Sequence, residues 1–177
     1  MKELLFAFLI FLHLSSLAQN VSELDIKGGF KGFKIGASLQ SVLNTYSSDM
    51  KLLDTETDAE GNTIRHVYKY ETLLPLTAFG YHVAFLQLDF KKSKLSTIWI
   101  HLTDVLGERY TYEGDFREIY KNIKEAFGKH TKERKVLSEE YIWKGNKIQL
   151  TLHGNKRDEG FFIHITLERA EKTTVDF

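Results

Sequence analysis

The sequence predicts an α+β fold: an antiparallel sheet with two helices on one face, built from two helix-strand-strand-strand repeats. Two amphipathic segments each precede three strand-like segments, and most of those strand-like segments alternate aliphatic and polar side chains. Strands that follow one another without an intervening helix favour antiparallel pairing. The content of 42% hydrophobic and 13% aromatic residues is too high for a disordered chain.

Residues 1–18 have the three parts of a secretory signal peptide. An apolar run of 11 residues follows Lys2, and Ser16 and Ala18 place small side chains before a cut ahead of Gln19. The run is shorter than the about 20 residues that a spanning helix needs, so we expect no membrane insertion after cleavage. A short membrane anchor or a buried first helix is the alternative. We expect a secreted or periplasmic protein.

We expect residues 19–177 to form one domain, with repeats over about 28–103 and about 112–169. These 159 residues can bury a stable core without disulfides, which the absence of cysteine excludes. Basic and acidic residues are equal in number, 24 of each, which argues against nucleic-acid binding. We expect a monomer.

The first repeat opens with a helix. Ser38 is a good N-cap, and the apolar residues after it recur at helical spacing, which predicts a helix over 38–47. Residues 48–63 are polar and acidic and predict a loop. The strand-like segments that follow are 64–70, 83–90 and 95–102. The last two are joined by a short polar turn and predict a hairpin.

The second repeat has the stronger helical pattern. Asp115 is the expected N-cap, and Gly128 is the expected C-terminal stop. The apolar face between them consists of Phe116, Ile119, Tyr120, Ile123, Ala126 and Phe127. The strand-like segments that follow are 140–144, 147–153 and 161–168.

Short motifs in both repeats resemble a group of small periplasmic proteins that includes the beta-lactamase inhibitory protein and the small outer-membrane-assembly lipoproteins. The first motif runs from Gly32 through Gly36 to Ser38 and into Val42 and Leu43. The second repeat contributes Phe127-Gly128-Lys129 and Tyr141-Ile142-Trp143. The resemblance implies a tandem helix-plus-sheet fold. The lipid-attachment cysteine and the inhibitor's disulfides have no counterpart in this sequence.

Strand alternation separates two faces of the predicted sheet. Aliphatic side chains fill one set of positions and should pack under the helices. The other set combines aromatic, histidine and polar side chains, a composition enriched at protein interfaces. We expect its members to form a binding surface: Phe85, Gln87, Trp99, His101, Gln149, Thr151, His153, Phe162 and His164. The alternative is a face half covered by residues 48–63 or 71–82.

The sequence contains no pattern that predicts catalytic or metal-ligating residues, and we expect no cofactor. Ser38 lacks a nucleophile elbow, and N-capping explains it. The expected function is non-catalytic binding of an envelope or extracellular protein. The alternative is a small secreted enzyme or metal-dependent protein in which His101, His153 and His164 converge.

Overall fold

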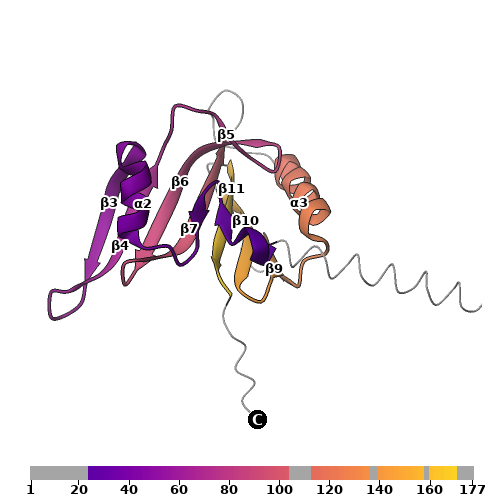
Figure 1. The fold of residues 1–177 in the computed structure, drawn as a ribbon. Coiled ribbons are helices and arrows are strands. Elements are labelled where there is room, and N and C mark those ends of the chain that lie inside the picture. The colour runs from indigo at the N-terminus through magenta and orange to yellow at the C-terminus, as the bar shows by residue number, and fades with distance from the viewer. Residues whose placement is uncertain (1–23, 104–112, 136–138, 158–159, 171–177) are drawn as a thin grey trace, which may run out of the picture.

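The computed structural model describes residues 24–103, 113–135, 139–157 and 160–170 (Figure 1). The expected signal peptide over residues 1–18 and its cut before Gln19 lie outside these ranges. Within them, no helix is both long and apolar enough to cross a membrane.

The described residues form a mixed α+β fold with a single large antiparallel sheet of nine strands. Eight strands follow the order β3-β4-β6-β7-β11-β10-β9-β8, and β5 pairs with β6 beside this path. The first half of the chain contributes β3 (Met50–Thr57), β4 (Thr63–Tyr70), β5 (Leu76–Ala78), β6 (Tyr81–Lys91) and β7 (Lys94–Thr103). The second half contributes β8 (Lys132–Lys135), β9 (Glu139–Lys144), β10 (Ile148–Arg157) and β11 (Gly160–Arg169). A separate two-stranded ribbon pairs β1 (Gly29–Phe30) with β2 (Phe33–Lys34).

The predicted helices are present, and one predicted cap is wrong. Helix α2 spans Leu39–Tyr46, and the Ser38 hydroxyl accepts the backbone N–H of Ser41 at 3.2 Å, which confirms the predicted N-cap. A short 3-10 helix, η1, follows over Ser47–Asp49. Helix α3 spans Glu113–Phe127, so Asp115 lies inside its first turn and is not the cap.

Helix α3 ends where the sequence predicts. Gly128 follows it with a φ of 78°, the left-handed conformation that suits glycine at a helix C-terminus. The indole nitrogen of the fully buried Trp143 donates to the carbonyl oxygen of Gly128 at 2.8 Å. This bond ties the end of the helix to strand β9.

The aliphatic side chains predicted to face the helices do form the core. Val42 of α2 and Phe116, Ile119 and Ile123 of α3 belong to the same buried cluster as the sheet. The strands contribute Leu86, Leu88, Phe90, Ile98, Ile100, Leu102, Ile148, Leu150, Leu152, Ile165 and Leu167, each at most 5% exposed. Both helices therefore pack on the same face of the sheet.

Residues 48–63 do not form the predicted loop: residues 50–57 are strand β3, which lies at the edge of the sheet. Seven of its eight residues are exposed, so nothing imposes the alternation by which a half-buried strand is recognised. The register skips Leu53, which creates a β-bulge and interrupts the exposed edge. Strand β8 at the opposite edge, also unpredicted, is polar and four residues long. Each helix is therefore followed by four strands of the main path, not three.

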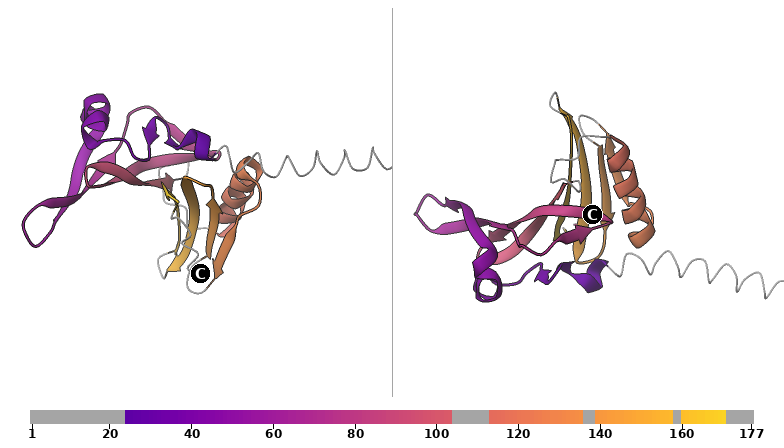
Figure 2. Two further views of the ribbon diagram at one scale, coloured as in Figure 1. Left: turned by 60° about the horizontal axis from the view of Figure 1, so that its bottom comes forward. Right: turned by 90° about the horizontal axis from the view of Figure 1, so that it is seen from above.

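The sheet bends strongly between its two halves. Figure 2 shows the violet-to-pink strands β3–β7 and the orange-to-yellow strands β9–β11 lying at a steep angle to each other. The halves join where β7 pairs with β11, from His101 opposite His164 to Thr97 opposite Glu168. The face away from the helices lies on the inner side of this bend (Figure 2).

A carboxylate fastens the N-terminal segment to the second half of the sheet. Asp25 accepts the backbone N–H groups of Asn146, Lys147 and Ile148 at 2.7 to 2.9 Å. A Cβ atom at Gly145 would lie 2.5 Å from Asp25 Oδ1, so a larger residue at this position would have to displace the carboxylate. Burial raises the pKa of Asp25, but the three hydrogen bonds and the charge of Lys147 outweigh it, and the net pKa is lowered.

We predict that Asp25→Asn lowers the free energy of unfolding at pH 7 by about 1 kcal/mol, because the three N–H groups lose a charged acceptor. Because the pKa of Asp25 is lowered in the folded state, its stabilising effect is fully present above the ordinary carboxyl pKa of 3.8. The effect is lost as the pH falls through the folded-state pKa. In urea unfolding, the free energy of unfolding should therefore fall less between neutral and acidic pH in the variant than in the wild type. Glu118→Gln on the exposed face of α3 is the control and should leave the curve unchanged.

Candidate functional site

The face of the sheet away from the helices, called the open face below, is ordered into rows by strand pairing. Residues directly opposite each other in neighbouring strands lie on the same face. One row crosses all eight strands of the main path and contains Trp99. Its members are Lys51, Lys69, Gln87, Trp99, Thr166, Thr151, Ile142 and Lys132.

A second row on the open face is a stack of rings. The ring of Phe85 stacks on His101 with centroids 4.1 Å apart, and His153 stacks on His164 at 4.4 Å. His101 and His164 are 6.4 Å apart and join the two pairs across the central strands. The Trp99 ring lies 5.2 Å from His164. Five of the nine residues predicted for the site thus form one aromatic cluster.

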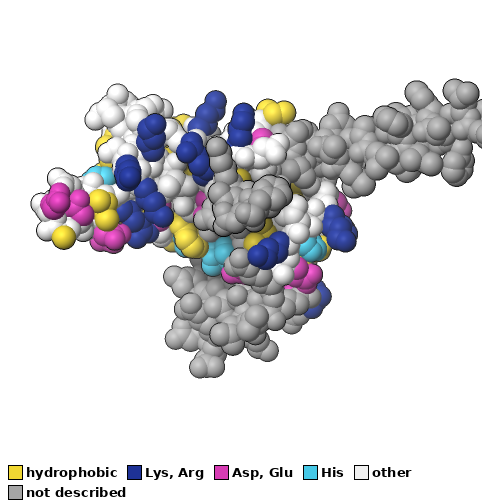
Figure 3. All heavy atoms as spheres, turned by 90° about the horizontal axis from the view of Figure 1, so that it is seen from below, with side chains coloured by type: hydrophobic (Ala, Val, Ile, Leu, Met, Phe, Trp, Pro, Cys, Tyr) yellow, Lys and Arg dark blue, Asp and Glu magenta, His cyan; other side chains and the backbone are white. Residues whose placement is uncertain are grey.

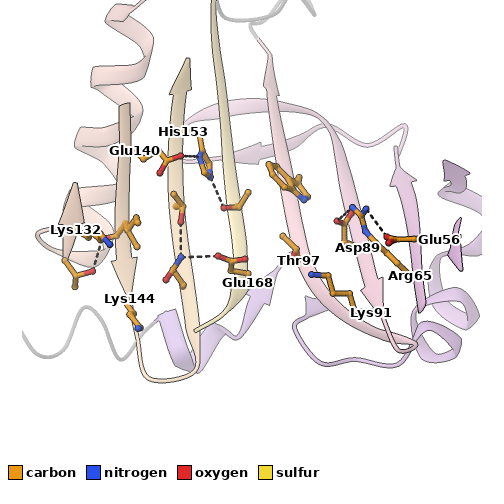
Figure 4. Close-up of a pocket in the computed structure, with 16 residues that line it drawn as sticks. Glu56, Arg65, Asp89, Lys91, Thr97, Lys132, Glu140, Lys144, His153 and Glu168 are labelled. Atoms are coloured by element: carbon orange, nitrogen blue, oxygen red, sulfur yellow. Dashed lines mark hydrogen bonds and ion pairs between the residues drawn. The ribbon is translucent and has the colours of Figure 1, made fainter. Parts of the chain in front are cut away.

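The open face carries a cavity of about 760 Å³, called the groove below. Its floor contains Trp99, Thr97, Thr151, Thr166, Gln149 and His153. Charged side chains and two further residues complete its lining: Glu56, Arg65, Asp89, Lys91, Thr131, Lys132, Glu140, Ile142, Lys144 and Glu168 (Figure 4). The volume falls within the range of about 300–1,000 Å³ that is common for ligand sites.

Histidine 153 links a carboxylate to a hydroxyl on the groove floor. His153 Nδ1 lies 3.2 Å from Glu140 Oε1, and His153 Nε2 lies 3.1 Å from the hydroxyl of Thr166 (Figure 4). Because an ionised carboxylate only accepts hydrogen bonds, Nδ1 carries the proton toward Glu140. In the neutral ring Nε2 then accepts the proton of the Thr166 hydroxyl. This carboxylate–imidazole–hydroxyl chain aligns one hydroxyl for proton transfer.

Gln149 extends the polar network beside this chain. Its amide nitrogen donates to Glu168 Oε1 at 3.0 Å and approaches the Thr151 hydroxyl at 3.4 Å. By contrast, the buried indole nitrogen of Trp99 has no hydrogen-bond partner among the described residues. Buried indole N–H groups usually find an acceptor, so Trp99 supplies an unused donor beneath the groove.

An ion pair lies at the β4–β6 end of the groove. Arg65 Nη2 is 2.6 Å from Asp89 Oδ2, and Gln87 donates to Asp89 Oδ1 at 3.1 Å. The Asp89 side chain is 6% exposed, whereas that of Arg65 is 31% exposed. The hydrogen bond with Asp89 raises the pKa of Arg65, so the guanidinium remains charged across the neutral range.

The structure brings most predicted site residues together. Trp99, Gln149, Thr151 and His153 line the groove. Phe85, His101 and His164 belong to the adjoining ring stack, and Gln87 supports the groove through Asp89. Phe162 lies in β11 opposite Asn155, and its side chain lies outside what the structure describes.

The segments expected as possible covers lie in the plane of the sheet. Residues 50–57 extend its edge as β3, and residues 76–78 form β5, which pairs with β6. Neither strand crosses the open face, so the alternative of a face covered by 48–63 or 71–82 is wrong for these strands.

Several groove residues were not predicted: Arg65, Asp89, Glu140, Ile142 and Thr166. Asp89 and Thr166 share the strand parity of the predicted set, so alternation alone could have included them. Arg65, Glu140 and Ile142 belong to strands whose faces show no clean alternation in sequence. Among the described residues, no cluster of three or more histidine or acidic side chains has the geometry to hold a metal ion.

We predict that Asp89→Ala lowers the free energy of unfolding by about 2 kcal/mol, because it leaves the half-buried Arg65 guanidinium without its acceptor. The control is Glu71→Ala, which removes an ion pair with Lys69 whose carboxylate is 61% exposed. This control should cost less than about 0.5 kcal/mol. Equal losses in urea unfolding would contradict a structural role for the Arg65–Asp89 pair.

Comparison with known proteins gives no family or function for this chain. No protein-family model, curated protein sequence or solved structure matched the chain.

Proposed function

We propose that this chain is a secreted or periplasmic, non-catalytic binding protein that takes a partner protein on its open face. The observation that carries the proposal is the groove: a hollowed sheet face with Trp99 in its floor. A face that only meets solvent needs no half-buried tryptophan or stack of histidines. Aromatic side chains within a polar rim are instead the composition of interaction hot spots.

The arrangement of the fold supports the same proposal. Among the described residues, the helices and the core lie on the opposite face, so the open face does not pack against them. The floor side chains are held by strands and by their hydrogen bonds with one another, which limits the entropy lost on binding. A rigid, preformed surface suits a module whose work is recognition.

Site-specific photocrosslinking in an envelope extract tests this proposal. A photoreactive side chain at Thr97 or Gln149 should form adducts with the same partner protein, whereas one at Glu118 on the outer face of α3 should not. Trp99→Ala should reduce the Thr97 adduct at least about ten-fold, as expected for a hot-spot aromatic residue. Leu73→Ala is the matched control, because Leu73 is fully exposed away from the groove. Adducts that form equally from Glu118 would contradict the proposal.

One observation favours a second candidate, a secreted acyl hydrolase. In the Glu140–His153–Thr166 chain, the Thr166 oxygen would attack an acyl carbonyl while its proton passes to His153 Nε2. His153 would then return that proton to the leaving alcohol, and water would release the acyl group from Thr166.

Hydrolysis of p-nitrophenyl acetate, with mass spectrometry for acyl-Thr166, tests the second candidate. Thr166→Val and His153→Gln should each lower the rate by about 100-fold or more if the chain is catalytic. Identical rates in the wild type and in both variants would exclude this function and leave the binding proposal in place.

A further inference from the structure

Basic side chains flank the groove on two sides. Arg65 and Lys91 lie on the side of β4 and β6, and Lys132 and Lys144 lie on the side of β8 and β9 (Figure 4). In the space-filling view, basic side chains also gather beside the acidic end of the β3–β4 hairpin (Figure 3). The charges of the groove are therefore separated in space, although the chain is neutral overall.

Strand register places three cations in one line at the β6 end. Arg65 is opposite Lys91, and Lys91 is opposite Lys94. Like charges directly opposite each other in a sheet destabilise it. Asp89 neutralises Arg65, but Lys91 and Lys94 form no ion pair with any described residue. A bound anion would relieve this repulsion.

The acidic side chains of the groove are already engaged. Asp89 and Glu56 lie 2.6 and 3.9 Å from the Arg65 guanidinium, and Glu140 and Glu168 form hydrogen bonds with His153 and Gln149. Lys132, like Lys91, is exposed and forms no ion pair within the described chain. A hydrogen bond from a neutral imidazole or amide does not cancel the charge of a carboxylate. Within the described chain, Lys91 and Lys132 are groove charges without an ion-pair partner, and they lie at its opposite sides.

The distance between these lysines sets the length of the ligand. Strands β6 and β8 are separated by five inter-strand steps in the order β6-β7-β11-β10-β9-β8. At about 4.8 Å a step, these steps cover about 24 Å, and Lys91 lies four residues along β6 from Gln87, the β6 member of the row of Lys132, so the path along the sheet is about 27 Å. The bend of the sheet makes the direct line between the two lysines shorter than this path, and about seven extended residues span about 24 Å. Trp99 lies between the two ends and offers apolar contact to the middle of such a segment, and Ile142 lies beside Lys132 at one end.

We propose that the ligand is an extended polypeptide segment of about seven residues with carboxylates at both ends, which meet Lys91 and Lys132. This inference rests on the proposed function and specifies its partner. The floor favours a peptide over a sulfated glycan. A sulfated glycan carries charges and hydroxyls along its whole length, whereas the lining between the two lysines includes the apolar Trp99 and the carboxylate of Glu168.

Binding of defined peptides tests the inference. The probe is a capped seven-residue peptide with two glutamates at each end and Ser-Val-Ser between them. The comparison peptides carry glutamine or lysine in place of the glutamates. Binding is followed by the fluorescence of Trp99, because the other tryptophan, Trp143, is fully buried in the core.

The acidic peptide should bind more tightly than the glutamine peptide, and added salt should weaken it. Lys91→Glu and Lys132→Glu should each weaken binding by about three-fold, and the double variant by about ten-fold, as expected for rim charges. Lys34→Glu on β2 makes the same change in net charge and is the matched control. It should leave the affinity unchanged.

Three results would overturn the inference: equal binding of the lysine peptide, an equal effect of Lys34→Glu, or tighter binding of a sulfated oligosaccharide of the same length. Absence of peptide binding at millimolar concentration would do so as well. If photocrosslinking from Thr97 still depends on Trp99 in any of these cases, the proposed function stands and only the ligand chemistry is wrong. If the acidic peptide does not bind and the Thr97 adduct does not depend on Trp99, both proposals are rejected.

Discussion

Burial of aliphatic side chains beneath α2 and α3 is the constraint on which the rest of the molecule depends. Leu86, Ile100, Leu152 and Ile165 come from four different strands, and each is completely buried on the helix side. Side chains alternate along a strand, so this burial also decides which residues face the other way. A slip of one residue in any of these strands would expose its aliphatic side chains, which makes the register strongly determined. The composition of the open face is thus a consequence of the core.

The pairing of β7 with β11 joins the open faces of the two halves of the sheet into one continuous surface. Trp99 belongs to the first half of the chain and Thr166 to the second, and they lie directly opposite each other across this junction. The ring stack crosses the same junction through His101 and His164. The sheet bends here (Figure 2), and side chains from both halves line one groove. Asp25, which is far from this junction in the sequence, holds the N-terminal segment against the second half through its hydrogen bonds.

In the groove, the polar side chains of the floor form hydrogen bonds with one another. The rim lysines Lys91 and Lys132, by contrast, have no ion-pair partner among the described residues. Glu140, His153 and Thr166 are linked by hydrogen bonds, and so are Gln149 and Glu168. Such a network rigidifies a site and is costly to leave half made. Lys91 and Lys132 stand outside it with solvated charges, which contribute more to orientation and association rate than to affinity. In the proposed function, shape and Trp99 at the centre would provide recognition, and the rim would provide selectivity.

The sequence by itself determined the α+β class, the helix bounded by Ser38, the stop at Gly128 and the division of four strands into buried and open faces. These features depend on local spacing: helical periodicity, capping and alternation are properties of neighbouring residues. Strands β3 and β8 escaped prediction because both are polar edge strands without clean alternation. Only the tertiary structure decided that His153 meets Glu140 and Thr166, that Arg65 meets Asp89, and that the lysines flank one groove. Strand order and register join residues far apart in the chain, and the pattern of a single strand carries no record of its neighbour.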